Sequence, residues 1–181
     1  LTGNYATPNK ALDVTLSADG QTAFVADGDL QIIDISDLAN PTLTGNYDTS
    51  DQARRVTLSA DGQTAFVADS SDGLDIINIS DLANPTLTGN YDTSLNAGDV
   101  VLSADGQTAF VTNGTDSLDI INISDLANPT LTDTLGTSNN PLDVILSADG
   151  RTAFVPDGSS GLQIIDIGYS QYFSSASDTL S

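Results

Sequence analysis

The chain has 181 residues, of which 25 are acidic and only four are basic, so its formal net charge at pH 7 is -21. All the acidic residues are Asp, and the sequence contains no Glu, His or Cys. This charge repels the phosphates of nucleic acids and of anionic membranes, so we expect neither as a partner. The missing Cys exclude disulfides, and the missing His and Glu leave few groups for acid–base catalysis.

One twelve-residue stretch, Leu-Ser-Ala-Asp-Gly-Gln-Thr-Ala-Phe-Val-Ala-Asp, occurs four times with few changes. The copies begin at Leu16, Leu58, Leu102 and Leu146, which gives spacings of 42, 44 and 44 residues. Periods of roughly 40–45 residues that contain several short β-rich runs are typical of the blades of a β-propeller.

The second repeat predicts four strands, which we name A to D in chain order: residues 55–59, 64–68, 74–79 and 86–93. Asp-Gly between strands A and B is a hairpin signal, because both residues tolerate positive φ. Pro85 ends the corner between strands C and D. Strands B and C are almost continuously apolar, which indicates that both of their faces are covered, as they are in a blade between two neighbours.

The order of the repeats suggests how the ends are arranged. Residues 1–5 match a D strand, and the last A–B–C set covers residues 143–167. We therefore expect an all-β propeller of four-stranded antiparallel blades over residues 1–167, with residues 1–7 closing the last blade. Residues 168–181 lack the C–D corner and form a C-terminal tail. Because the sequence starts at Leu1 without a signal peptide, we expect a processed product or a piece of a longer protein.

Residues 22–36, the Asn40-Pro41 pair and residues 43–47 resemble the LVIVD-repeat family of β-propellers, and the similarity extends to about Ile167. The resemblance implies a bacterial extracellular or cell-surface protein whose motif residues are structural and not catalytic. Two architectures fit four repeats. One is a four-bladed ring within a monomer, which we prefer. The other is a head-to-tail homodimer that forms an eight-bladed ring, with residues 1–7 exchanged between the two chains.

Differences between the repeats concentrate in the D–A connections (residues 8–12, 50–54, 94–98 and 138–142) and the B–C turns (residues 27–29, 69–73, 113–117 and 157–161). In an up-and-down blade these two sets of loops emerge on the same face of the disc, which we call the loop face. Loops on a rigid scaffold commonly carry binding residues. The candidate ligand-binding residues on this face are Lys10, Arg54, Arg55, Asn96 and Asn140.

A calcium site is a further possibility. Asp13, Asp99 and Asp143 begin three of the four A strands, and carboxylates around a narrow opening attract Ca²⁺. Arg55 begins the fourth A strand and could serve as their internal counter-ion instead. The aspartates of the B–C turns, such as Asp69 with neighbouring Asp72, offer a second place.

The sequence therefore predicts a non-catalytic scaffold that binds a protein or glycan ligand outside the cell. It leaves open a purely structural repeat module, or an engineered propeller fragment without activity of its own. A Ca²⁺-binding propeller is the other alternative. We expect no enzyme, because the sequence has no Ser/His/Asp set, phosphate loop or His-containing zinc site.

Overall fold

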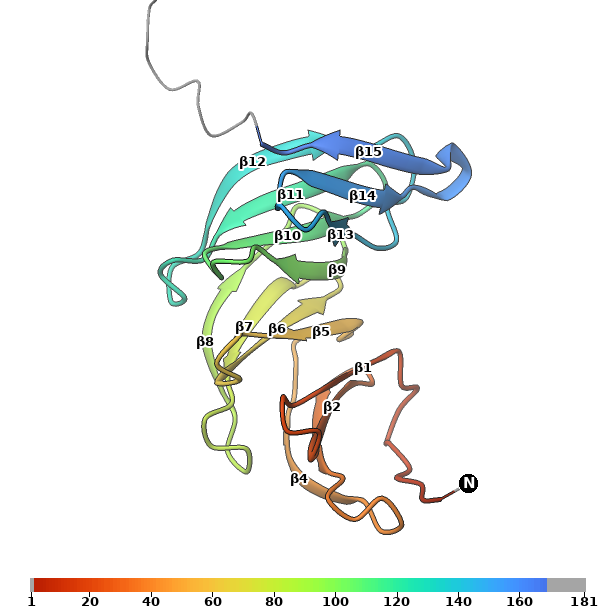
Figure 1. Ribbon diagram of the computed structural model, residues 1–181, viewed down its shortest axis with the longest axis vertical. Coiled ribbons are helices and arrows are strands. Elements are labelled where there is room, and N and C mark those ends of the chain that lie inside the picture. Colours follow the sequence, from red (N-terminus) through yellow and green to blue (C-terminus); the bar gives the residue numbers. More distant parts are fainter. Residues whose placement is uncertain (1, 169–181) are drawn as a thin grey trace, which may run out of the picture.

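The computed structural model describes residues 2–168, which form four antiparallel sheets, here called blades 1 to 4 (Figure 1). Blade 1 contains β1 (Asp13–Leu16), β2 (Thr22–Ala26), β3 (Leu30–Asp34) and β4 (Thr42–Tyr47). Blade 2 contains β5 (Arg55–Leu58), β6 (Thr64–Asp69), β7 (Gly73–Asn78) and β8 (Thr86–Tyr91). Blade 3 contains β9 (Ala97–Leu102), β10 (Thr108–Asn113), β11 (Ser117–Asn122) and β12 (Thr130–Gly136). Blade 4 contains β13 (Ile145–Leu146), β14 (Thr152–Pro156) and β15 (Leu162–Asp166), with the 3₁₀ helix η1 (Gly158–Ser160) between the last two.

The A–B turns are built by a short hydrogen-bonded motif that recurs in every repeat. In blade 2, the Ser59 hydroxyl donates to Asp61 Oδ1 at 2.6 Å, and the N–H of Thr64 donates back to the Ser59 hydroxyl at 3.0 Å. Gly62 adopts φ 68°, a left-handed conformation that favours glycine. The predicted hairpin therefore follows from the Ser-Ala-Asp-Gly sequence itself.

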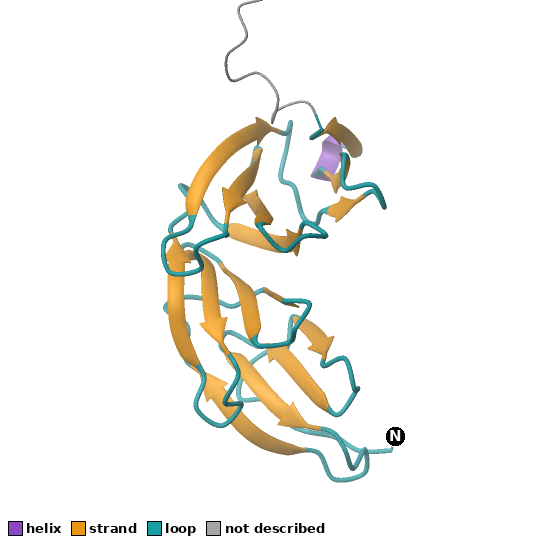
Figure 2. Ribbon diagram, turned by 60° about the vertical axis from the view of Figure 1, so that its left-hand side comes forward, coloured by secondary structure: helices purple, strands orange, loops and turns teal. Residues whose placement is uncertain are grey.

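The blades stack side by side into an arc, with strands β1, β5 and β9 on its inner side and β4, β8 and β12 on its outer side (Figures 1 and 2). A separate apolar core fills each interface. Between blades 1 and 2 it contains Phe24 and Ile32 from one side and Val56, Val67 and Ile77 from the other. Equivalent residues fill the next two interfaces. The continuous apolar runs of strands B and C are thus buried on both faces in the middle blades, as predicted.

Glycine on the outer strands allows neighbouring blades to approach closely. A Cβ atom added to Gly45 would collide with the backbone oxygen of Leu82, which lies in the C–D corner of the next blade. Gly89 has the same relation to Leu126. The corresponding residue on β12 is Asp133, and there the next blade does not contain the Ser-Asp-Leu-Ala-Asn-Pro corner.

The arc does not close within one chain, contrary to our preferred architecture. Residues 2–7 form no strand, and they lie at the end of the arc opposite to β15 (Figure 1). The last blade therefore has three strands among the described residues, and the predicted pairing of its outer edge with the N-terminal segment is not seen in this chain. The physical reason lies in the three packed interface cores, which fix the angle between neighbouring blades, and at that angle four blades span only part of a circle.

Within residues 2–168, no helix has the length and hydropathy needed to cross a membrane. The predicted C-terminal tail lies outside the described residues except for Gly168.

Candidate functional site

The loop face is held together by hydrogen bonds between its two sets of loops. The last residue of strand β6, Asp69, accepts the N–H of Asp51 from the D–A connection at 2.9 Å. Asn113 accepts the N–H of Leu95 in the same way at 3.0 Å. Bridges between Gly28 and Ala53 and between Ser70 and Ala97 also join the B–C turn of one blade to the connection that enters the next. The two sets of loops therefore share one face, as the sequence predicted.

A cavity of about 430 Å³ opens on this face. The connections that lead into all four A strands contribute to its wall, together with the B–C turn of blade 3. The lining residues are Leu12, Gln52, Arg54, Arg55, Asn96, Gly98, Gly114, Thr115, Asn140, Pro141 and Leu142. Four of the five candidate ligand-binding residues are thus brought to one cavity. The fifth, Lys10, lies in a neighbouring hollow of about 270 Å³ that also includes Asp27, Asp29 and Asp51.

Arg55, which holds the position of Asp13, Asp99 and Asp143 in blade 2, lies between two of these aspartates. The Arg55 guanidinium is 3.4 Å from Asp13 and 3.7 Å from Asp99, measured between nitrogen and carboxylate oxygen. Asp13 also accepts the N–H of Val56 at 3.0 Å. The predicted calcium ligands Asp13 and Asp99 therefore have a counter-ion within the chain, which is the alternative that the sequence left open.

Asp99 is the most perturbed group at the axis. Burial, and to a lesser extent the nearby Asp143 carboxyl, raise its pKa to about 7, while the N–H of Val144 and the Arg55 charge act in the opposite direction. Val144 donates to Asp99 at 2.9 Å. The arginine at 3.7 Å does not prevent this shift, because desolvation of a buried carboxylate outweighs an ion pair of that length.

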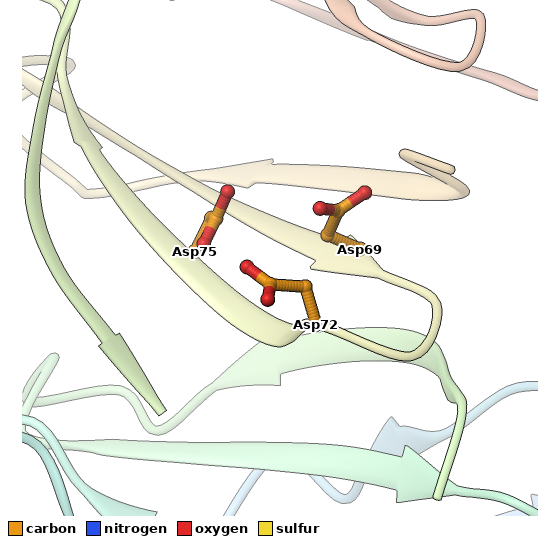
Figure 3. Close-up of side chains that lie close together, drawn as sticks. All are labelled: Asp69, Asp72 and Asp75. Atoms are coloured by element: carbon orange, nitrogen blue, oxygen red, sulfur yellow. The ribbon is translucent and has the colours of Figure 1, made fainter. Parts of the chain in front are cut away.

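A second group of carboxylates lies at the B–C turn of blade 2 (Figure 3). One oxygen from each of Asp69, Asp72 and Asp75 lies within 4.8 Å of the others. Asp69 and Asp75 are buried, and burial raises the pKa of Asp69 and brings that of Asp75 to about 6. Asn90 Nδ2 donates to Asp75 at 2.9 Å and to the backbone oxygen of Asp72 at 3.0 Å.

Sequence reasoning foresaw Asp69 and Asp72 as neighbours but missed Asp75. The residue lies on β7, in a strand that reads as apolar, so its burial was not evident. The signal was present in the repeats, because every blade has a polar residue at this strand position: Gln31, Asp75, Asp119 and Gln163.

Comparison with known families finds one match. The model of the LVIVD repeat matches residues 10–49, 52–93 and 96–137, which together make up more than half of the chain. A search of curated proteins finds no match.

Several solved structures have a similar fold. The chain is 20% identical to a hydrazine synthase chain from Kuenenia stuttgartiensis, with a TM-score of 0.75 over 94% of this chain and 50% of that one. It is 15% identical to the β-propeller domain of Cps50 (Swd1) from Myceliophteria thermophila, with a TM-score of 0.71 over 85% of this chain and 52% of that one. The chain thus spans about half the length of these two structures.

A third structure is similar over nearly its whole length. The computationally designed protein Ika4 is 9% identical, with a TM-score of 0.70 over 90% of this chain and 94% of that one. At these identities the likenesses show the fold alone, so the activity of the synthase is not transferred to this chain.

Proposed function

Because the chain belongs to the LVIVD-repeat family, we propose that it is a non-catalytic binding scaffold whose loop face holds a protein or glycan ligand. The observation that supports this most is the cavity of about 430 Å³ whose wall comes from the connections of all four blades. Ligand sites are typically concave and carry a few polar groups on a rigid frame. As the family resemblance implies, the proposal places the chain outside the cell or at its surface, which fractionation of the producing cells would test.

Arg54 is the residue we assign to ligand recognition. It lines the cavity, and within residues 2–168 no carboxylate lies within 4 Å of its nitrogens. Its Nε is buried and has no hydrogen-bond partner in the same part of the chain. The corresponding positions in the other repeats are Leu12, Gly98 and Leu142, so the repeat itself does not require an arginine there. An Arg guanidinium with free donors is suited to bind a carboxylate or another oxygen-rich group.

Three of the four basic residues, Lys10, Arg54 and Arg55, lie on the loop face of a chain with a net charge of -21. Because Arg55 is paired with two aspartates, Arg54 is the cation of the cavity that is left for a ligand. The uncharged polar groups of the wall come from Gln52, Asn96, Thr115 and Asn140. This combination favours a polar ligand that offers oxygen acceptors, such as a glycan with hydroxyl and carboxyl groups or a polar peptide segment.

The alternatives have less support. Calcium binding at Asp13, Asp99 and Asp143 would compete with Arg55, which already lies between two of these residues. A purely structural module would leave the unpartnered Arg54 and the loop differences without a role.

The proposal is tested by probing arrays of neutral glycans, uronate-containing glycans and short peptides with the purified chain. We expect binding that falls about 10- to 100-fold in Arg54→Gln, the range for losing a hydrogen bond to a charged group. The matched control is Arg151→Gln, which removes the same charge at an exposed A–B turn on the opposite face. Equal losses in both variants would show that net charge is responsible. No bound probe at all would favour the structural module.

A further inference from the structure

The two ends of the arc expose the faces that are buried at every interface inside it. In blade 1, Val14 and Leu16 are 57% and 54% exposed, whereas Val56, which occupies the position of Val14 in blade 2, is 3% exposed. In blade 4, Leu162 and Ile164 are 60% and 66% exposed. The corresponding residues in the other blades are fully or almost fully buried: Leu30, Leu74, Leu118, Ile32, Ile76 and Ile120.

These two faces are complementary in the same way as two adjacent blades. Inside the chain, Phe24 and Ile32 of blade 1 pack against Val56, Val67 and Ile77 of blade 2. By the repeat, the face of blade 4 offers Phe154 and Ile164, and the face of blade 1 offers the exposed Val14. Beside Val14 lie Val25 and Ile33, which are 8% and 4% exposed because Tyr5 packs against them.

The face of blade 1 is also hollowed to receive such side chains. A cavity of about 440 Å³ lies there, and Tyr5, Val14, Val25 and Ile33 are in its wall. The exposed face of blade 4 therefore corresponds to the side of each internal interface that provides Phe and Ile. The exposed face of blade 1 corresponds to the side that receives them.

The N-terminal segment, which forms no strand here, lies close to the C–D corner of blade 1. A Cβ atom added to Gly3 would collide with the backbone oxygen of Leu38, as one added to Gly45 would collide with that of Leu82. Residues 2–5 thus occupy the position that the outer strand of a preceding blade would have. The edge of β15, in turn, has no fourth strand among the described residues.

A polar contact also repeats across the interfaces. Asp13 accepts the N–H of Val56 in the next blade, and Asp99 accepts that of Val144. Asp143 holds the same position in blade 4. Its counterpart donor would be the N–H of Val14 at the other end of the arc, in a second copy of the chain.

From these observations we infer that two copies of this chain associate head to tail into a closed ring of eight blades. Each copy provides the face of blade 4 that covers blade 1 of the other, and each provides residues 2–5 as the fourth strand beside β15 of the other. The occupant is a second copy because Phe154, Leu162 and Ile164 of blade 4 repeat the apolar side chains that face the next blade inside the chain, with Pro156 in the place of Ala26. The similarity of these four blades to about half of a β-propeller domain agrees with a ring of two such arcs.

The assembly also completes the loop face. One chain supplies only half of the wall around the axis, so the second copy would bring a second Arg54 and a second set of D–A connections to the same opening. A dimer would therefore present two symmetry-related cavities or one larger one.

The inference is tested by measuring the mass of the full chain in solution by size-exclusion chromatography with light scattering. We expect about 37 kDa, which is twice the chain mass of 18.6 kDa. Ile164→Asp, which places a charge in the junction, is expected to give 18.6 kDa with an unchanged circular dichroism spectrum. Leu87→Asp is the control, because Leu87 is equally apolar and 47% exposed but lies on outer strand β8, away from either end face.

Each outcome of this measurement decides the question. A monomeric wild type would mean that the end faces are covered within the chain or not at all, and would overturn the inference. A mass that grows with concentration would indicate an open filament and would overturn ring closure. Loss of the dimer in Leu87→Asp as well as in Ile164→Asp would show that the interface lies elsewhere.

Discussion

Four equivalent side chains tie the D–A connection to strand B, and they differ in charge in an informative way. Asp27, Asp69, Asn113 and Asp157 each accept a backbone N–H from that connection. Asn113 can also donate, and its Nδ2 lies 2.7 Å from Asp119 on the neighbouring strand. In blade 2 the same pair is Asp69 and Asp75, two buried carboxyls. Asp69 cannot donate to Asp75, which accepts a hydrogen bond from Asn90 on the outer strand instead. Blade 2 therefore carries an electrostatic strain that blade 3 avoids.

We predict that Asp69→Asn stabilises the chain at pH 7 by about 1 kcal/mol. Burial is the main cause of the raised pKa of Asp75, but the variant removes the smaller contribution of the Asp69 charge and supplies the amide donor found in blade 3. The pKa of Asp75 is raised from 3.8 to about 6 in the folded chain. The folded state thus holds a proton that the unfolded state has lost between about pH 4 and pH 6, and wild-type stability falls as pH rises through that window. The stabilisation by Asp69→Asn should be complete above about pH 6 and should become smaller as the pH falls toward about 4.

Urea unfolding at pH 7 and pH 4.5 measures this effect. The control is Asp116→Asn, which removes the same charge from an exposed turn in blade 3. A gain that is the same at both pH values, or equal in the control, would contradict the role of the buried pair.

The residue scale was only partly predictable from the sequence. The crowding of Asp13, Asp99 and Arg55 at the axis followed from their shared position at the start of strand A. The partner of each carboxylate did not follow, because Arg55 is equally able to face solvent until the neighbouring blades fix its position. The burial of Asp75 was missed for a similar reason, since strand periodicity does not say how deeply a polar side chain is covered by the next blade.

The strands themselves follow closely from local sequence. The predicted strand C at residues 74–79 is β7 at Gly73–Asn78, and the predicted strand B at residues 64–68 is β6 at Thr64–Asp69. Turn chemistry explains this agreement, because Asp61 and Gly62 fix the hairpin and the Asp81 carboxylate holds the corner by accepting the N–H of Ala83 at 3.1 Å. The close approach of the outer strands to the C–D corners of the next blade could not be predicted from the sequence. Gly45 and Gly89 lie at these contacts, but a glycine alone does not reveal what approaches it.

We predict that Gly45→Ala destabilises the chain by about 1–3 kcal/mol, the usual cost of forcing an extra carbon into a packed interface. The added methyl would meet the backbone oxygen of Leu82, which cannot move without shifting the corner of blade 2. Gly136→Ala on β12 is the control, because a Cβ atom added there would have no atom within 4 Å and the φ of Gly136 is not positive. Thermal unfolding of both variants tests this. Equal destabilisation by the two substitutions would mean that Gly45 is needed for the conformation of its backbone and not for the contact with Leu82.

At the scale of the whole molecule, the need for covered blades was predictable and the way to cover them was not. Apolar strands such as β6 and β7 showed that each sheet requires two neighbours. The curvature of the stack depends on how the side chains of three interfaces pack together, which repeat length does not reveal. The structure shows an arc whose two end blades carry exposed apolar side chains, and the ring is our proposal for covering them.

The most direct test of that proposal is a disulfide across the junction, which is feasible because the chain has no native Cys. Within blade 1, Gln31 pairs with Asn46, and the repeat places Gln163 opposite Asn4 of a second copy in the same register. An oxidised mixture of Asn4→Cys and Gln163→Cys chains should give a covalent dimer, just as Gln31→Cys with Asn46→Cys in one chain should give an internal disulfide. If the internal pair forms while the mixture stays monomeric on a non-reducing gel, the two ends do not meet and the eight-bladed ring is wrong.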